Sequence, residues 1–227
     1  MYQFLETIQL KDNGVPVLSH KKIEFITTRC LEIYNNSLLT TPSEVNIHDF
    51  IIYLTKTDGL KYETRTLGKI LNNAILGVTD LKENAIYIDP LTELNPHRLR
   101  FTQAHEVGHW ILHRHKPVED YNVTDRTLIF KDTEDSLNMQ KRLVTPTDWI
   151  EWQANAFASA LLIPISTFSD DVQNGIKELS IHTQIDMYDS IEVSPKDYSR
   201  LILYLQQLYN VSQTTISYRL KQLESIK

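Results

Sequence analysis

Two histidines four residues apart, His105 and His109, enclose a glutamate in the segment His-Glu-Val-Gly-His. On a helix, residues four apart lie on one face, about 6 Å apart along the axis, so their imidazoles can bind one zinc ion. Glu106 can then take a proton from a water at the metal. The pattern therefore predicts a hydrolytic zinc centre with His105 and His109 as ligands and Glu106 as general base.

A third zinc ligand must come from elsewhere, because hydrolytic zinc usually has three protein ligands. His113 continues the four-residue spacing, but it would lie about 12 Å from His105 along the helix axis. Ligands that each lie about 2 Å from one metal cannot be so far apart. Glu151 is a better candidate, since it precedes Asn155 by one helical turn and that amide could orient an imidazole.

Both the H-E-x-x-H motif and Glu151 also have an explanation that involves no metal. Short patterns such as H-E-x-x-H occur by chance, and Glu151 taken alone would be a solvated helix charge. However, two histidines and a glutamate buried on one helix without partners would be energetically costly. A bound metal removes that cost, so we expect a metal site.

The motif requires a helix, and the surrounding residues predict one. Asn95 suits the N-cap and Pro96 the first helical position, while Pro117 follows the expected end. Gly108 inside this helix costs about 1 kcal/mol relative to alanine. We therefore expect another element to approach closely at Gly108.

The third ligand also requires a helix. Thr145 is a plausible N-cap, Pro146 suits the first position, and Pro164 marks the expected end of an alanine-rich segment. Glu151 would lie in the second turn of this helix.

Together the two helices resemble the ImmA/IrrE family of zinc metallopeptidases. The resemblance is carried by residues 98–110, 151–158 and 161–164, and it covers about residues 85–164. It implies a zincin-like α+β fold, zinc bound by His105, His109 and Glu151, and Glu106 as general base. It also implies a protein substrate, typically a helix-turn-helix repressor.

The segment between the two helices, residues 116–145, is long and charged and looks like an insertion. Its alternating run at 123–130 predicts a hairpin or flap near the cleft, or equally a solvated loop. Three side chains are candidates for stabilising the oxyanion of the reaction: Tyr121, His113 and His115.

The N-terminal part supplies the remaining elements. Apolar spacing predicts helices over residues 21–37 and 43–56. β-like runs follow at 60–66, 74–78 and 85–89, with a hairpin loop at 80–84. We expect a small antiparallel sheet beside the H-E-x-x-H helix.

The C-terminal part, residues 165–227, is expected to be a helical segment separate from a peptidase domain at 1–164. Residues 165–196 are polar and acidic and predict no helix. Two helices then resemble a helix-turn-helix, with Asn210 and Ser212 at the turn and Ile216 and Leu220 facing inward. The small positive charge of residues 197–227 favours packing or partner docking over DNA binding.

Composition narrows the class of protein. Hydrophobic content of 41% and charged content of 23% are ordinary for a globular chain, and a net charge of −6 argues against general nucleic-acid binding. Cys30 is the only cysteine, which excludes an intrachain disulfide. With no signal-peptide pattern and no apolar run long enough to span a membrane, we expect a cytoplasmic protein.

Two functions follow from these patterns. The first is a zinc endopeptidase that cleaves a regulatory protein. The second is a non-proteolytic zinc-containing regulator that binds a repressor or DNA through its C-terminal helices. The intact Glu106 favours the enzyme, because a purely structural zinc site does not need that carboxylate.

Overall fold

The structure is a computed structural model that describes residues 9, 11, 15–70, 72–114, 129–132, 143–182, 184–185 and 191–226. Its helices and strands, in chain order, are α1 (His20–Asn35), η2 (Asn36–Leu39), α2 (Ile47–Asp58), β1 (Lys61–Thr64), β2 (Lys69–Ile70), β3 (Asn73–Ala74), β4 (Gly77–Asp80), β5 (Ala85–Ile88), η3 (Pro90–Leu94), α3 (Pro96–His113), β6 (Ile129–Asp132), α4 (Pro146–Leu162), α5 (Ile165–Glu178), β7 (Gln184–Ile185), β8 (Ile191–Glu192), α6 (Pro195–Tyr209) and α7 (Gln213–Ile226).

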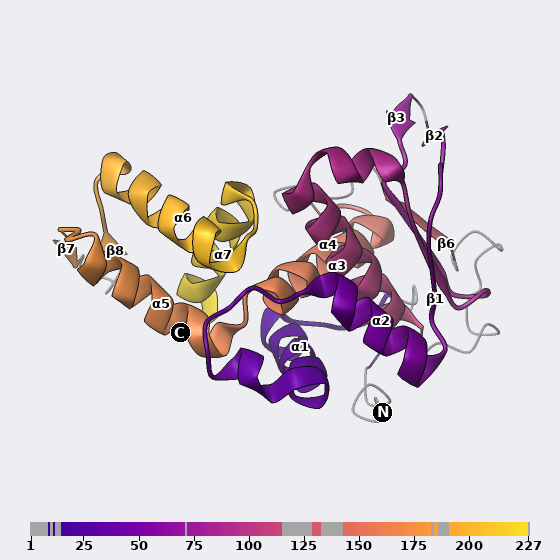
Figure 1. The fold of residues 1–227 in the computed structure, drawn as a ribbon, viewed down its shortest axis with the longest axis horizontal. Coiled ribbons are helices and arrows are strands. Elements are labelled where there is room, and N and C mark those ends of the chain that lie inside the picture. Colours follow the sequence, from indigo (N-terminus) through magenta and orange to yellow (C-terminus); the bar gives the residue numbers. More distant parts are fainter. Residues whose placement is uncertain are drawn as a thin grey trace.

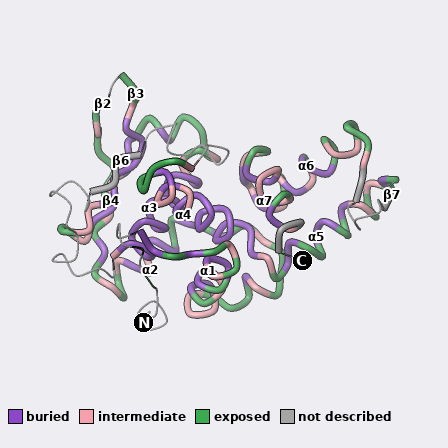
Figure 2. Tube along the Cα trace, turned by 180° about the vertical axis from the view of Figure 1, so that it is seen from behind, coloured by how far each residue is buried: buried purple, intermediate pink, exposed green. Residues whose placement is uncertain are grey.

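The elements form two lobes (Figure 1). The larger lobe holds the sheet and α1 to α4, and the smaller lobe holds α5, α6 and α7. Helices α3 and α4 lie at the centre of the larger lobe and are buried along most of their length (Figure 2). The fold is α+β, as the sequence predicts.

Helix α3 begins as the sequence predicts, and it ends at His113, two residues before the last predicted helical residue. The Asn95 side chain accepts a hydrogen bond from the backbone N–H of Arg98, and Pro96 occupies the first turn. The expected close approach at Gly108 is also confirmed. A Cβ at Gly108 would lie 3.1 Å from the backbone oxygen of Ala154 in α4, so glycine allows the two helices to touch.

Helix α4 begins with a capping box. The Thr145 hydroxyl accepts from the backbone N–H of Asp148, and the Asp148 carboxylate accepts from the N–H of Thr145. This pair satisfies backbone donors at the first turn, so the position of Glu151 one turn later is well defined.

The predicted antiparallel sheet is partly wrong, because the four-stranded sheet is mixed. Its order is β1-β5-β4-β6; β1 pairs with β5 in parallel, whereas β5-β4 and β4-β6 are antiparallel. The β2-β3 hairpin and β4 separate β1 from β5, which gives the chain enough length to return in the same direction. The predicted strand 74–78 is in fact divided between β3 and β4. The hairpin at 80–84 is confirmed by the pairing of Asp80 with Ala85.

One helix boundary and one missed helix also differ from the predictions. Helix α2 starts at Ile47 rather than at residue 43, because Asn46 is its N-cap and accepts from the N–H of Asp49. The prediction that residues 165–196 lack a helix is wrong. Helix α5 spans Ile165–Glu178 and buries Phe168 and Val172, which are four residues apart.

Within the predicted insertion, residues 129–132 form β6, which pairs with β4 at the edge of the sheet. His115 and Tyr121 lie outside the described residues. The predicted break between the last two helices is present. Asn210 ends α6 with a φ of 50°, and the Ser212 hydroxyl accepts from the N–H of Thr215 in α7.

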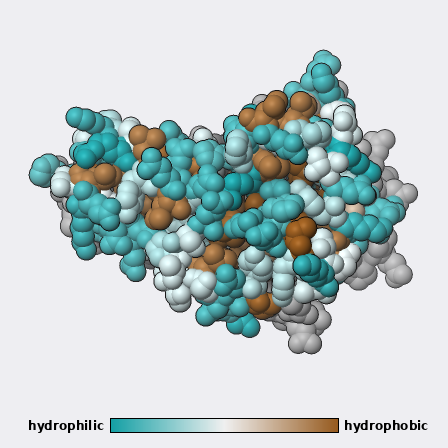
Figure 3. Space-filling view, viewed as in Figure 1, coloured by the Kyte–Doolittle hydropathy of each residue, from teal (hydrophilic) through white to brown (hydrophobic). Residues whose placement is uncertain are grey.

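The face of the molecule in Figure 3 is mostly hydrophilic, with separate hydrophobic patches. One patch lies over η3, where Leu94 is 84% exposed. Exposed apolar side chains are common on protein surfaces. None of the helices in the described ranges combines the length and apolarity that crossing a membrane requires.

Candidate metal centre

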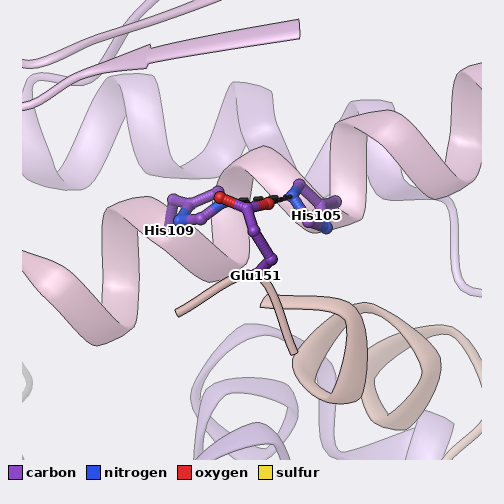
Figure 4. A group of neighbouring side chains, drawn as sticks. All are labelled: His105, His109 and Glu151. Carbon is purple, nitrogen blue, oxygen red and sulfur yellow. Dashed lines mark hydrogen bonds and ion pairs between the residues drawn. The ribbon is translucent and has the colours of Figure 1, made fainter. Parts of the chain in front are cut away.

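Three ligand atoms converge where α3 crosses α4. His105 Nε2 and His109 Nε2 lie 3.0 Å apart, and Glu151 Oε2 lies 3.4 Å from the first and 3.6 Å from the second. Figure 4 shows the carboxylate of Glu151 facing both rings, which project from one face of α3. Both histidines are completely buried, and the Glu151 side chain is 12% exposed.

These distances fit a single metal ion. A tetrahedral ion with ligands about 2.0–2.1 Å away separates them from one another by about 3.3 Å. Glu151 Oε2 is buried and makes no hydrogen bond within the described part of the chain. In that part, these three side chains are also the group of His, Cys, Asp and Glu residues that could hold a metal. His, His and Glu are a donor set that zinc commonly accepts.

The far side of each imidazole is held by a hydrogen-bonding side chain. His105 Nδ1 lies 2.9 Å from Asn155 Oδ1, as the helical spacing of Asn155 and Glu151 suggests. His109 Nδ1 lies 3.1 Å from His113 Nδ1, and His113 Nε2 lies 3.1 Å from Gln153 Oε1. When Nδ1 donates in this way, the lone pair of Nε2 is left for a metal.

When both Nε2 atoms carry lone pairs instead of protons, they and Glu151 Oε2 are three electron-rich atoms that face one another. Their mutual repulsion is unfavourable in a buried site unless a cation lies between them. The residues present therefore fit a divalent metal, and His105, His109 and Glu151 would hold it.

Glu106 lies between the two histidines in the sequence, and its side chain lies against strand β4. Its carboxylate is buried, and Oε1 occupies the space where a Cβ would lie if Gly77 had one, at a distance of 2.0 Å. The Thr79 hydroxyl is within hydrogen-bonding distance of both the Glu106 carboxylate and its backbone carbonyl oxygen. Strand β4 therefore fixes where the Glu106 carboxylate lies.

Four residues at this site are not predicted from the sequence: Gly77, Thr79, Gln153 and Pro16. Gly77 alone has a sequence signal, since a glycine inside a strand pattern often marks close approach by another group. Thr79 and Gln153 have none, because their roles depend on which side chains the fold brings against them. Pro16 takes part through its backbone oxygen, which accepts from Gln153 Nε2 at 2.7 Å.

His113, a candidate for stabilising the oxyanion, and the single cysteine are not part of the cluster. His113 ends α3, as expected of a helix C-terminal residue, but it is buried and contacts His109 on the ring edge away from the three ligand atoms. Cys30 is buried elsewhere in the core, and burial raises the pKa of its thiol to about 12. A thiol of this kind is unreactive near neutral pH.

The chain matches a known protein family over most of its length. Residues 45–221 match the Peptidase_M78 family, described as the IrrE N-terminal-like domain. The matched segment covers most of the chain and contains β4, α3 and α4. No curated protein matches the chain.

Proposed function

The chain belongs to the Peptidase_M78 family of the IrrE N-terminal-like domain, a metallopeptidase family, and we propose that it is a zinc-dependent endopeptidase that cleaves a regulatory protein. This membership agrees with the resemblance predicted from the two helices. The substrate we propose is a helix-turn-helix repressor, whose cleavage would relieve repression.

The observation that carries the proposal is the convergence of three ligand atoms at the helix crossing, with Glu106 beside them in the chain. When bound there, a zinc ion would polarise the scissile carbonyl and lower the pKa of a water. A purely structural zinc site would be closed by a fourth protein ligand. The three-residue set found among the described residues is what a catalytic site uses.

Glu106 has the role of general base in this proposal. Its carboxylate would accept a proton from the attacking water and then deliver that proton to the leaving amine. The Thr79 hydroxyl and the absence of a side chain at Gly77 hold the carboxylate in place, so little reorganisation is needed during the reaction.

The alternative, a regulator that binds DNA through the C-terminal helices, receives less support. Arg219 is the arginine of α7, and its guanidinium is fully buried against Glu24 of α1. It is therefore not available to contact phosphate, which leaves α7 with little positive charge for DNA.

The test compares wild type with Glu106→Gln, using Glu93→Gln as a control because Glu93 is exposed on η3. Each purified protein is loaded with zinc and incubated with the repressors encoded beside its gene, and fragments are identified by mass spectrometry. We expect Glu106→Gln to keep its zinc but to cleave about 10²- to 10⁴-fold more slowly. A stable complex or a DNA mobility shift without fragments from wild type would favour the binder instead.

A further inference from the structure

The hydrogen bonds behind His109 form a chain that starts at a backbone carbonyl. Gln153 Nε2 lies 2.7 Å from the Pro16 oxygen, Gln153 Oε1 lies 3.1 Å from His113 Nε2, and His113 Nδ1 lies 3.1 Å from His109 Nδ1. His109, His113 and Gln153 are all buried. This series of hydrogen bonds links the N-terminal segment, α4 and α3.

The direction of each hydrogen bond in this series is determined by the one before it. The Pro16 carbonyl can only accept, so Gln153 must turn its NH₂ toward Pro16 and its oxygen toward His113. His113 Nε2 must then carry the proton that it donates to Gln153, and the Nδ1 of a neutral His113 is left as an acceptor. His109 therefore donates from Nδ1, and its Nε2 faces Glu151 with a lone pair.

We propose that His113 and Gln153 are positioning residues that fix the tautomer and the ring orientation of His109, and so set the affinity of the site for its metal. The inference rests on the proposed function to the extent that His109 is a zinc ligand. Partners of ligand imidazoles generally have this effect, and their loss typically weakens metal binding by about 10- to 100-fold.

The geometry of α3 explains why His113 can act in this way although it cannot be a ligand. Side chains four apart on a helix lie one above the other, and the longer ones lean toward the N-terminus. The His113 ring therefore lies over the previous turn, with its centroid 5.1 Å from that of His109 and tilted by 46°. The four-residue spacing that places His113 too far from His105 thus places it against the back of His109.

Helix α4 consequently supports both imidazoles as well as carrying a ligand. Asn155 contacts His105 directly, whereas Gln153 acts on His109 through His113. The close crossing at Gly108 is what brings Gln153 and Asn155 within reach of α3. We expect the two imidazoles to respond differently to substitutions, because one has a single support and the other has two in series.

The experiment measures the zinc dissociation constant of the full chain by competition with a chromophoric chelator. The variants are His113→Leu, Gln153→Leu, the double variant and His113→Asn, whose Oδ1 can take the place of Nδ1 as an acceptor. His97→Leu, in the first turn of α3, is the control. Circular dichroism of the zinc-free proteins identifies the variants that fold.

We expect about 10- to 100-fold weaker zinc binding by His113→Leu and by Gln153→Leu. The double variant should be no weaker than His113→Leu alone, since the two act in series. His113→Asn should recover most of the affinity, and His97→Leu should match wild type. The absorption spectrum of the cobalt-substituted protein should change in His113→Leu and return toward wild type in His113→Asn, which a general loss of stability would not produce.

A folded His113→Leu that binds zinc within twofold of wild type would overturn the inference. If His113→Leu does not fold, Gln153→Leu decides in the same way, because its imidazoles are intact. Failure of the proposed function gives a different result. Wild type would then bind zinc, with the expected differences among variants, and yet produce no fragments.

Discussion

The candidate metal centre and a second buried polar cluster, here called the Arg219 cluster, both join helices that are far apart in sequence. The Arg219 cluster consists of Arg219 and Gln222 in α7, Glu24 in α1 and the Ile163 carbonyl. The guanidinium donates to both oxygens of Glu24, to Gln222 Oε1 and to the Ile163 carbonyl oxygen. Every contact of this guanidinium is therefore one between a donor and an acceptor.

The candidate metal centre lacks this complementarity. Its three converging atoms are all suited to accept or to bind a cation, and Glu151 Oε2 makes no hydrogen bond in the described part of the chain. Burial of polar groups therefore does not by itself indicate function. A cluster whose donors and acceptors match stabilises the fold, whereas one whose acceptors converge without a donor indicates a ligand that completes it.

The largest effect expected from this comparison is loss of activity in Gly77→Ala. The new Cβ would lie 2.0 Å from Glu106 Oε1, which is impossible, so the carboxylate must move. Because the far end of a flexible side chain gives way, we expect the protein to fold and to bind zinc normally. Cleavage in the fragment assay should fall by about 10²-fold or more, as for loss of a general base.

Thr79→Ser is the matched control on the same strand, since it keeps the hydroxyl that contacts Glu106. Its cleavage rate and zinc affinity should both stay near those of wild type. Normal cleavage by Gly77→Ala would mean that the position of Glu106 set by β4 is not the reactive one.

The second expected effect is a loss of stability when the Arg219 cluster is broken. Arg219→Met removes the cation from the buried Glu24 carboxylate, and breaking a buried pair in this way costs about 3–5 kcal/mol. Urea unfolding should show this loss in the zinc-free protein. The folded variant should bind zinc with the affinity of wild type, because the Arg219 cluster supplies no ligand.

The double variant Glu24→Leu/Arg219→Met tests the interpretation as a matched pair. Apolar replacement of both partners often restores the stability that removal of one partner takes away. We therefore expect the double variant to be more stable than Arg219→Met. The opposite order would show that Glu24 stabilises the fold through contacts other than Arg219.

The sequence predicts which side chains come together at the candidate metal centre better than it predicts the surrounding fold, and the reason is physical. His105, His109, Glu151 and Asn155 are related by helical spacing, and strong caps at Asn95 and Thr145 define both helices. Local rules therefore place these side chains on the right faces. Only the crossing of the two helices remained to be determined, and Gly108 indicated its position.

Contacts between distant elements are what the sequence does not predict. Thr79 meets Glu106 across the β4-α3 interface, and Gln153 meets Pro16 across more than half of the chain. Helix α5 is a different case, because the sequence does contain a signal for it. Phe168, Val172 and Ile176 recur every four residues, which indicates an amphipathic helix in spite of the polar and acidic residues between them. The parallel pairing of β1 with β5, by contrast, depends on the path between them.

The smallest expected effect is a pH dependence that belongs to the Arg219 cluster and not to the metal centre. His20 at the start of α1 accepts a hydrogen bond from Gln222 at Nδ1 and packs edge-on against Trp152 at 4.7 Å. Burial lowers the pKa of His20 below its ordinary value of 6.5, and Arg219 lowers it further, while the Glu24 carboxylate acts in the opposite direction.

Because the folded pKa of His20 is the lower one, protonation favours the unfolded chain. The stability that the neutral imidazole contributes is present above about pH 6.5 and is lost as the pH falls through the folded pKa. Zinc-free wild type should therefore lose more stability between pH 7 and pH 5 than His20→Gln, by a small amount that urea midpoints can resolve. The zinc-free protein is required, because proton-linked metal release would otherwise dominate the change. Equal losses in the two proteins would mean that His20 stays solvated in the folded protein. The Arg219 cluster would then end at Gln222 and would not extend to His20.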